Sequence, residues 1–244
     1  MSDEEMVQVP GTFGFSAIPM DMLEESEYSL VTILVDVSSS VSRFRDLLIN
    51  MLKASIKSCE DNPRAENLLI RVCTFADQGY FNEIHGFKPL EFIDFSVYDK
   101  IRCGGMTAAC DAMMEALNAT DAYAKTLWEQ DFKSNAHIIM ITDGQENDSK
   151  YNTNDVDSCL RDMTMQERRD LESVFSLLIA VNMEDPRIAQ ILDDFHKECG
   201  FDQFLDAKDA TPETMSKIQG WITSSISSSV RALGSGSKSA ILQV

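Results

Sequence analysis

Apolar runs of strand length alternate with amphipathic stretches along most of the chain. Four of these runs are nearly continuous in apolar residues, and they cover residues 30–36, 67–75, 136–142 and 174–181. Continuous runs of this length are typical of strands buried on both faces, as in parallel sheets. A shorter run at 79–87 follows a turn signal and is predicted to be an edge strand, and residues 203–205 form a short last strand.

Between these runs, apolar residues recur at three- and four-residue steps, which is the period of an amphipathic helix. The predicted helices cover residues 42–58, 108–128 and 156–171, then 185 to the glycine at 200, and a last segment that begins near 211. Strands that alternate with helices predict an α/β fold: a doubly wound, mostly parallel central sheet with helices on both faces. Because crossovers between parallel strands are right-handed, the carboxyl ends of the strands should meet at one rim.

Three parts of the chain differ in composition. Residues 1–27 contain no Lys or Arg and are interrupted by Pro and Gly, so we interpret them as an N-terminal arm ahead of a domain at 28–230. In one interpretation, four apolar side chains of the arm dock on the domain: Phe13, Phe15, Ile18 and Met20. In the other, the arm is a mobile terminus. Residues 231–244 are rich in Gly, Ser and Lys and are predicted to be a flexible tail.

The composition of the 244-residue chain, with 44% hydrophobic and 25% charged residues, fits one sizeable globular domain. A formal net charge of −19 argues against binding to nucleic-acid phosphates or an anionic membrane surface, and it favours cations or basic partners. No apolar run reaches the length of a membrane span, and the acidic N-terminus does not resemble a signal peptide. Six cysteines without a C-x-x-C pair predict reduced thiols and a cytoplasmic protein.

Oxygen-bearing side chains gather where the predicted strands end. One stretch is a D-x-S-x-S motif, a second reads G-G-x-T, and a third is an apolar strand that ends in T-D-G; their candidate residues are Asp36, Ser38, Ser40, Thr107 and Asp143. Ligands bind beyond the carboxyl ends of strands in open α/β sheets, and small oxygen ligands suit a hard divalent cation. The alternative is structural, with the Ser and Thr hydroxyls acting as helix N-caps.

In type, order and approximate spacing, these three segments resemble the von Willebrand factor A domain family over about residues 29–230. The resemblance implies a metal-ion-dependent adhesion site (MIDAS), whose ion is Mg²⁺ or else Mn²⁺ or Ca²⁺. Ser38 and Ser40 would bind the ion directly, and Thr107 would bind it directly or through water. Asp36 and Asp143 would hold coordinated waters. The remaining position would accept an Asp or Glu side chain of a protein partner, so the resemblance implies an interaction module and not an enzyme.

A narrower resemblance concerns the intracellular bacterial A domains linked to tellurium-resistance gene clusters. They are similar in length, and their last helix is similar to the Trp- and Ser-rich segment at 221–227. This resemblance implies a cytoplasmic stress-response role in an intracellular bacterial or phage-related system, beside an ATPase, a kinase or a phosphatase. Ser39 departs from the Gly that many relatives carry between the two serines, and a Ser restricts the backbone of this loop.

Two other functions compete with metal-dependent binding. A Mg²⁺-dependent phosphoryl-transfer enzyme could use Asp36 as its nucleophile, but such sites need a second acid two residues later, where this chain has Ser38. No glycine-rich phosphate-binding motif supports that function. A domain of the same fold without an ion would be a scaffold.

His196 and Cys199 share a helix face, yet two ligands do not make a zinc site. The polar residues at 145–148 are interpreted as a solvated loop.

Overall fold

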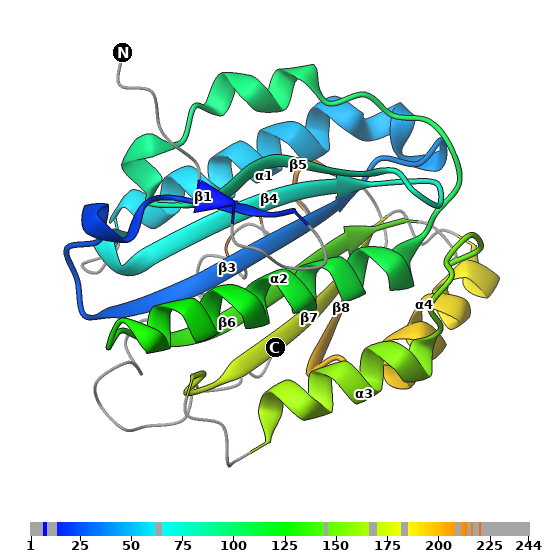
Figure 1. Ribbon diagram of the computed structural model, residues 1–244. Coiled ribbons are helices and arrows are strands. Elements are labelled where there is room, and N and C mark those ends of the chain that lie inside the picture. Colours follow the sequence, from blue (N-terminus) through cyan, green and yellow to red (C-terminus); the bar gives the residue numbers. More distant parts are fainter. Residues whose placement is uncertain are drawn as a thin grey trace.

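A computed structural model describes residues 7–8, 14–61, 65–143, 146–165, 170–181, 185–207, 211–213, 216 and 220 of the chain (Figure 1). These residues form an eight-stranded sheet in the order β1-β2-β5-β4-β3-β6-β7-β8. The strands are β1 Val7–Gln8, β2 Ser16–Ala17, β3 Glu27–Asp36, β4 Leu68–Phe75, β5 Phe81–Lys88, β6 Lys133–Thr142, β7 Val174–Val181 and β8 Gln203–Ala207. The predicted α/β class with a mostly parallel sheet is confirmed.

Strands β4, β3, β6, β7 and β8 are parallel, whereas β5 runs antiparallel to β4. The prediction that residues 79–87 form an edge strand is wrong, because β2 pairs with the outer side of β5 and β1 extends the sheet further. Both outer strands come from the N-terminal segment. A local polar pattern marks a strand as exposed, but it does not reveal a distant segment that covers its edge.

Helices cover both faces of the sheet. The long helices are α1 Arg45–Ser58, α2 Ala109–Glu129, α3 Thr153–Thr164 and α4 Pro186–Cys199. Short 3₁₀ helices are η1 Met20–Met22, η2 Ser40–Phe44, η3 Cys59–Asp61, η4 Ala65–Asn67, η5 Leu90–Phe92 and η6 Phe95–Lys100. The helix predicted at 42–58 thus starts with a 3₁₀ turn, and the one predicted at 156–171 is shorter. The predicted last helix lies mostly outside the described residues, and the tail at 231–244 lies entirely outside them.

Alternate side chains of the central strand β3 enter two separate cores. Val31, Ile33 and Val35 pack with α1 on one face, and Leu30 and Leu34 pack with α2 on the other. Side chains of α3 and α4 complete the second core, and Figure 1 shows α2 and α3 together on the near face of the sheet. Burial on both faces explains why this strand is a continuous apolar run, and it leaves the strand ends as the place for polar side chains.

Residues 14–20 of the predicted arm pack against the domain. Phe15 is buried, and its ring meets the rings of Phe87 and Tyr123 edge-on at 6.2 Å. A Cβ atom on Gly86 would lie 1.8 Å from the backbone oxygen of Ser16, so only glycine permits this close approach of β2 to β5. Residues 14–20 therefore dock on the domain, as the first interpretation of the arm predicted. Phe13 lies outside the described residues. The domain boundaries stay a prediction.

Gly86→Ala should therefore detach the arm from β5. The new methyl group collides with backbone, which cannot move away as a flexible side chain can. We expect a loss of about 2 kcal/mol of unfolding free energy, the usual cost of overpacking a core. Urea unfolding measures the loss, and limited proteolysis reports earlier cleavage near residues 14–20. Gly14→Ala is the control, since nothing lies within 4 Å of its Cβ position; an equal effect of both variants would contradict this account.

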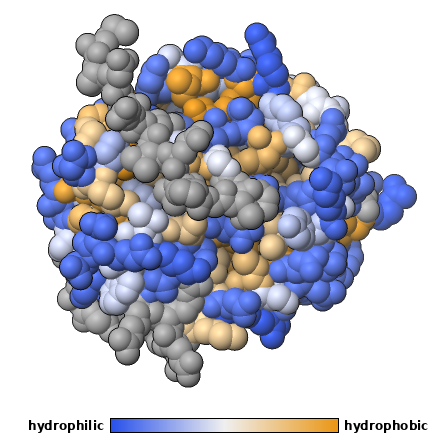
Figure 2. All heavy atoms as spheres, in the orientation of Figure 1, coloured by the Kyte–Doolittle hydropathy of each residue, from blue (hydrophilic) through white to orange (hydrophobic). Residues whose placement is uncertain are grey.

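The face shown in Figure 2 is largely hydrophilic, with smaller hydrophobic areas between the charged side chains. No described helix combines the length and the hydrophobicity needed to cross a bilayer. No disulfide joins the cysteines of the described part, and four of the thiols are buried: Cys59, Cys73, Cys110 and Cys199.

Candidate metal-binding site

The central strand pair brings two of the predicted acids to the same edge of the sheet. Strand β3 ends at Asp36, and β6, its parallel neighbour, ends at Thr142, directly before Asp143. Both carboxyl-bearing residues are buried, at 1% and 6% exposure. The turn after β3 adds Ser38, which is 2% exposed, and then Ser40, which is exposed to solvent. Four of the five predicted residues therefore lie at one rim.

A line of oxygen atoms connects the two strand ends. The hydroxyl oxygens of Ser38 and Ser40 are 3.0 Å apart, and the Ser40 hydroxyl donates to the Asp143 carboxylate at 2.6 Å. The interpretation of these serines as helix caps is wrong, because the residue that precedes η2 is Ser39, and it makes no side-chain capping hydrogen bond. The two hydroxyls point instead toward each other and toward the neighbouring acid, as ligands of one ion would.

Asp36 is held on both of its carboxylate oxygens. Oδ1 accepts from the backbone N–H of Ser38 at 2.7 Å, and Oδ2 accepts from the Thr142 hydroxyl at 2.5 Å. Burial raises the pKa of Asp36 to about 6; the hydrogen bonds from Thr142 and Ser38 oppose that rise, and the charge of Asp143 adds to it. A carboxylate whose oxygens are both engaged is suited to an indirect role, in which it orients a neighbouring group.

Thr107 reaches the same rim through its loop. The Gly104 N–H donates to Val37 O at 2.8 Å, and the Ser39 N–H donates to Gly105 O at 3.1 Å, so the loop lies along the serine turn. Gly105 has φ 93°, a conformation that favours glycine, and a Cβ there would meet the Asp77 side chain at 2.3 Å. Of the two glycines in the G-G-x-T motif, Gly105 therefore has a steric reason to be glycine.

Thr107 itself is 3% exposed, and it does not cap α2. The N-cap position is Ala108, which makes no side-chain capping bond. The backbone N–H of Thr107 donates to Asn147 Oδ1 at 3.1 Å, and the Asn147 N–H donates to Thr107 O at 3.0 Å. This reciprocal pair ties Thr107 to the loop that follows Asp143. All five predicted residues thus lie at the same rim, and their role as ligands stays a prediction.

Sequence reasoning missed the residues that hold this rim together. Glu146, which was assigned to a solvated loop, accepts from the Cys110 N–H at 2.8 Å and from the Ser149 N–H at 2.9 Å. Ser149 Oγ accepts from the Asp111 N–H at 3.1 Å. The first turn of α2 is therefore satisfied by the loop after β6 and not by a local cap. The only signal in the sequence was an acidic and amide-rich stretch with no helical or strand period.

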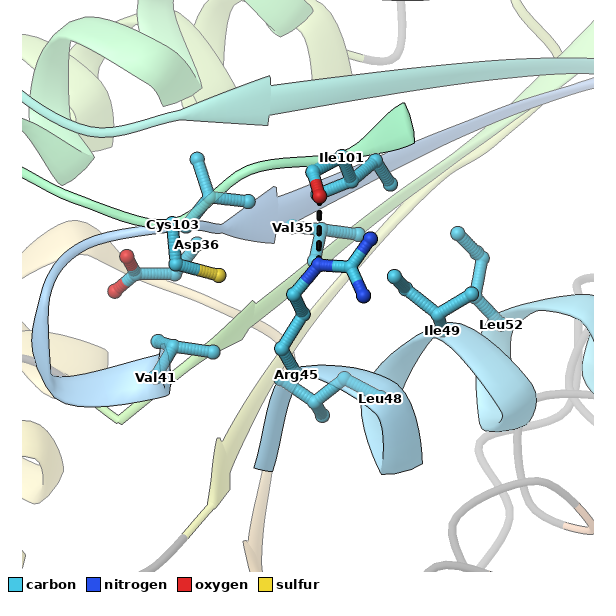
Figure 3. Close-up of a pocket in the computed structure, with 10 residues that line it drawn as sticks. Val35, Asp36, Val41, Arg45, Leu48, Ile49, Leu52, Ile101 and Cys103 are labelled. Carbon is cyan, nitrogen blue, oxygen red and sulfur yellow. Dashed lines mark hydrogen bonds between the residues drawn. The ribbon is translucent and has the colours of Figure 1, made fainter. Parts of the chain in front are cut away.

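The pocket on the α1 side of Asp36 is small. Figure 3 shows a small pocket between the end of β3 and α1, lined mainly by apolar side chains, with Cys103 beside Asp36. Its volume is about 10 Å³, and a cavity must reach roughly that size to hold one water molecule. The Arg45 side chain crosses it and donates through Nε to Ile101 O at 2.6 Å, the dashed line in Figure 3.

The described residues contain no cluster of three or more His, Cys, Asp and Glu side chains that could hold a metal ion. A zinc site at His196 and Cys199 has no support, and the His196 ring lies against Phe204 with centroids 5.3 Å apart. The predicted site at the rim is of a different kind, because three of its five side chains are hydroxyls. Hydroxyl and carboxylate oxygens fit a hard cation such as Mg²⁺, so the donor set at the rim suits the predicted ion.

Known structures share this architecture. The pilus adhesin SpaC from Lactobacillus rhamnosus GG, in its open conformation, superposes with a TM-score of 0.62 at 10% identity, over 85% of this chain and 31% of that one. Proximal thread matrix protein 1 from the mussel byssus gives a TM-score of 0.55 at 17% identity, over 84% of this chain and 46% of that one. The chain has a von Willebrand factor A-like fold.

Two further similar structures are consistent with this von Willebrand factor A-like fold. One is a mutant of the PilB minor pilin from Streptococcus sanguinis, with a TM-score of 0.56, 15% identity, and coverage of 86% of this chain and 64% of that one. The other is the mussel protein with a zinc-occupied MIDAS motif, with a TM-score of 0.55 and 17% identity, over 86% of this chain and 47% of that one. This chain spans less than two thirds of each of these proteins. No protein-family model matches the sequence, and no curated protein matches it.

Proposed function

We propose that this chain is a metal-dependent protein-interaction module with a MIDAS-type site. The observation that carries the proposal is the line of oxygens from Ser38 through Ser40 to Asp143, with contacts of 3.0 and 2.6 Å. The common function that we propose for these oxygens is to bind one ion. The zinc-occupied MIDAS motif in a protein of similar fold supports a divalent cation as that function.

The side chains divide into two roles. Ser38, Ser40 and Thr107 would hold the ion through their hydroxyls, while Asp36 and Asp143 would orient coordinated waters. The two engaged oxygens of Asp36 support its indirect role. Bound Mg²⁺ supplies a Lewis-acidic position that accepts a carboxylate oxygen. Neutral hydroxyl ligands leave most of the ion's charge unbalanced, so an Asp or Glu of a partner protein is the expected occupant of that position.

Catalysis is less well supported than binding. Phosphoryl-transfer sites with a nucleophilic Asp need a second acid two residues later, and this chain has Ser38 at that position. We therefore propose that the chain is not an enzyme. A scaffold without an ion is the second alternative, and in it the Ser40–Asp143 hydrogen bond would serve only to join the two strand ends.

The narrower identity is part of the proposal. We place the chain with the intracellular bacterial A domains of the tellurium-resistance type, where a partner would be an ATPase, a kinase or a phosphatase. The absence of disulfides among the described cysteines supports a reducing compartment such as the cytoplasm. Two of the similar structures are bacterial pilus proteins, and an extracellular location is the competing assignment.

Capture of the partner from a lysate of the native host tests this function. With the tagged chain as bait, we expect a partner to be retained in Mg²⁺, released by EDTA and retained again when Mg²⁺ is restored. Alanine at the acidic residue that the partner contributes should abolish retention without a change in the partner's own folding. Retention that is unchanged in EDTA would argue against a metal-bridged contact.

A further inference from the structure

A groove lined by arginines lies beside the candidate metal site. Its volume is about 640 Å³, and its lining residues are Ser42, Arg43, Arg45, Asp46, Leu47, Arg102 and Cys103. One wall is the turn that leads from η2 into α1, and the other is the segment just before Gly104. The hydrogen bonds that join Gly104 to Val37 and Ser39 to Gly105 fasten these two walls together. The groove is therefore continuous with the loops that carry Ser38, Ser40 and Thr107.

The charge of this groove is opposite to that of the whole chain. The chain carries a net charge of −19, yet three arginines and one aspartate line the groove. Arg45 pairs with Asp46 and also donates to the backbone oxygens of Ile101 and Asp99, at 2.6 and 2.7 Å, so it forms a fixed wall. Arg102 is exposed, and its guanidinium makes no hydrogen bond or ion pair with another described residue.

We propose that this groove binds an acidic segment of the partner, next to the carboxylate that the metal accepts. The inference rests on the proposed function, and it adds the chemistry of the partner: several Asp or Glu residues flank the one at the ion. A guanidinium forms two parallel hydrogen bonds with a carboxylate, which favours Arg102 as the group that reads these flanking acids.

The positive charge of the groove and the negative charge of the whole chain favour one kind of segment in the groove over the others. A basic segment would be attracted by most of this acidic protein but repelled at the groove, where the exposed Arg102 meets it. An apolar segment would leave the Arg102 charge without a partner, since Leu47 and Cys103 are the main apolar lining. An acidic segment would be repelled by most of the protein surface and attracted only at the groove and the ion. These two points of attraction together would fix the position and the direction of the partner segment.

Three labelled peptides of Gly and Ser test the proposal in Mg²⁺ buffer, by fluorescence anisotropy. The first has a single central Asp, the second has further Asp residues on both sides of it, and the third has Lys on both sides. We expect the Asp-flanked peptide to bind about tenfold more tightly than the single-Asp peptide, an advantage that shrinks as salt is added. Arg102→Glu should remove this advantage, and Arg102→Lys should keep part of it.

Lys125→Glu is the matched control, because it makes the same change of charge in the half of α2 that is remote from the rim. The groove proposal is overturned if Arg102→Glu keeps the full advantage, if the Lys-flanked peptide binds best, or if no peptide binds. Mn²⁺ titration of the same variants separates the two proposals. If the parent chain binds Mn²⁺ but does not discriminate between the peptides, the groove proposal alone fails. If the parent chain does not bind Mn²⁺, the proposed function fails.

Discussion

Replacing Ser38 and Ser40 together with alanine is expected to abolish tight Mn²⁺ binding. The two hydroxyl oxygens lie 3.0 Å apart, and one of them contacts Asp143, so the variant removes two proposed direct ligands at once. Loss of an outer partner alone commonly weakens metal affinity by about 10- to 100-fold, and we expect a loss of more than about 100-fold here. Titration calorimetry, with Mn²⁺ electron paramagnetic resonance as a second readout, measures it.

The same loop supplies the control for this experiment. Ser39 lies between the two residues and is exposed, and its side chain makes no hydrogen bond in the described structure. Ser39→Ala should bind Mn²⁺ as the parent does. Urea unfolding of both variants checks the fold, where the lost hydrogen bonds should cost no more than about 2 kcal/mol. Equal heats of Mn²⁺ binding in the double variant and the parent would remove the proposed site.

Breaking the buried ion pair between Arg71 and Glu83 should give the largest loss of stability. Arg71 Nε lies 2.6 Å from Glu83 Oε2, and the guanidinium carbon is 5.6 Å from the centroid of the Phe81 ring. Arg71 is 1% exposed, whereas the side chain of Glu83 is 16% exposed and also accepts from the Ser16 N–H at 3.0 Å. Loss of the glutamate therefore leaves the more deeply buried charge without its ion-pair partner, although the charge of Glu115 still acts on Arg71.

We expect Glu83→Leu to lower the free energy of unfolding by about 3–5 kcal/mol, the cost of an uncompensated buried charge. Arg71→Met should lower the free energy of unfolding by less, because the remaining Glu83 carboxylate still accepts a hydrogen bond from the Ser16 N–H and is partly exposed to solvent. The double variant should be more stable than Glu83→Leu alone, since no charge is left buried. Urea unfolding of the parent, both single variants and the double variant completes the thermodynamic cycle.

An exposed ion pair on the same molecule sets the scale for this prediction. Lys125 and Asp121 are 2.7 Å apart, but the lysine side chain is 57% exposed. Lys125→Met should change the unfolding free energy by less than about 1 kcal/mol. A double variant as unstable as Glu83→Leu would show that the ion pair is not what limits stability at this site.

The sheet and its helices could be predicted because their signals are local. The run at 174–181 matches β7 residue for residue, and Asp185 with Gly200 marks both ends of α4. Burial on two faces produces a continuous apolar run, and a helix on a sheet produces a three- to four-residue period, so each element carries its own mark. The edge position of β5 was wrong because the covering segment lies some seventy residues away in the sequence, at Ser16–Ala17.

By itself, the sequence determined the α/β class, the order of most elements and the oxygen-bearing residues at the strand ends, all of which follow from short-range patterns. The sequence predicted that Ser40 and Asp143 share one rim, but only the tertiary structure decided which groups are in direct contact: Ser40 with Asp143, Thr107 with Asn147, and Arg71 with Glu83. Strand order and register set these meetings. They arise from the packing of both faces of the sheet at once, and no stretch of the chain records that packing alone.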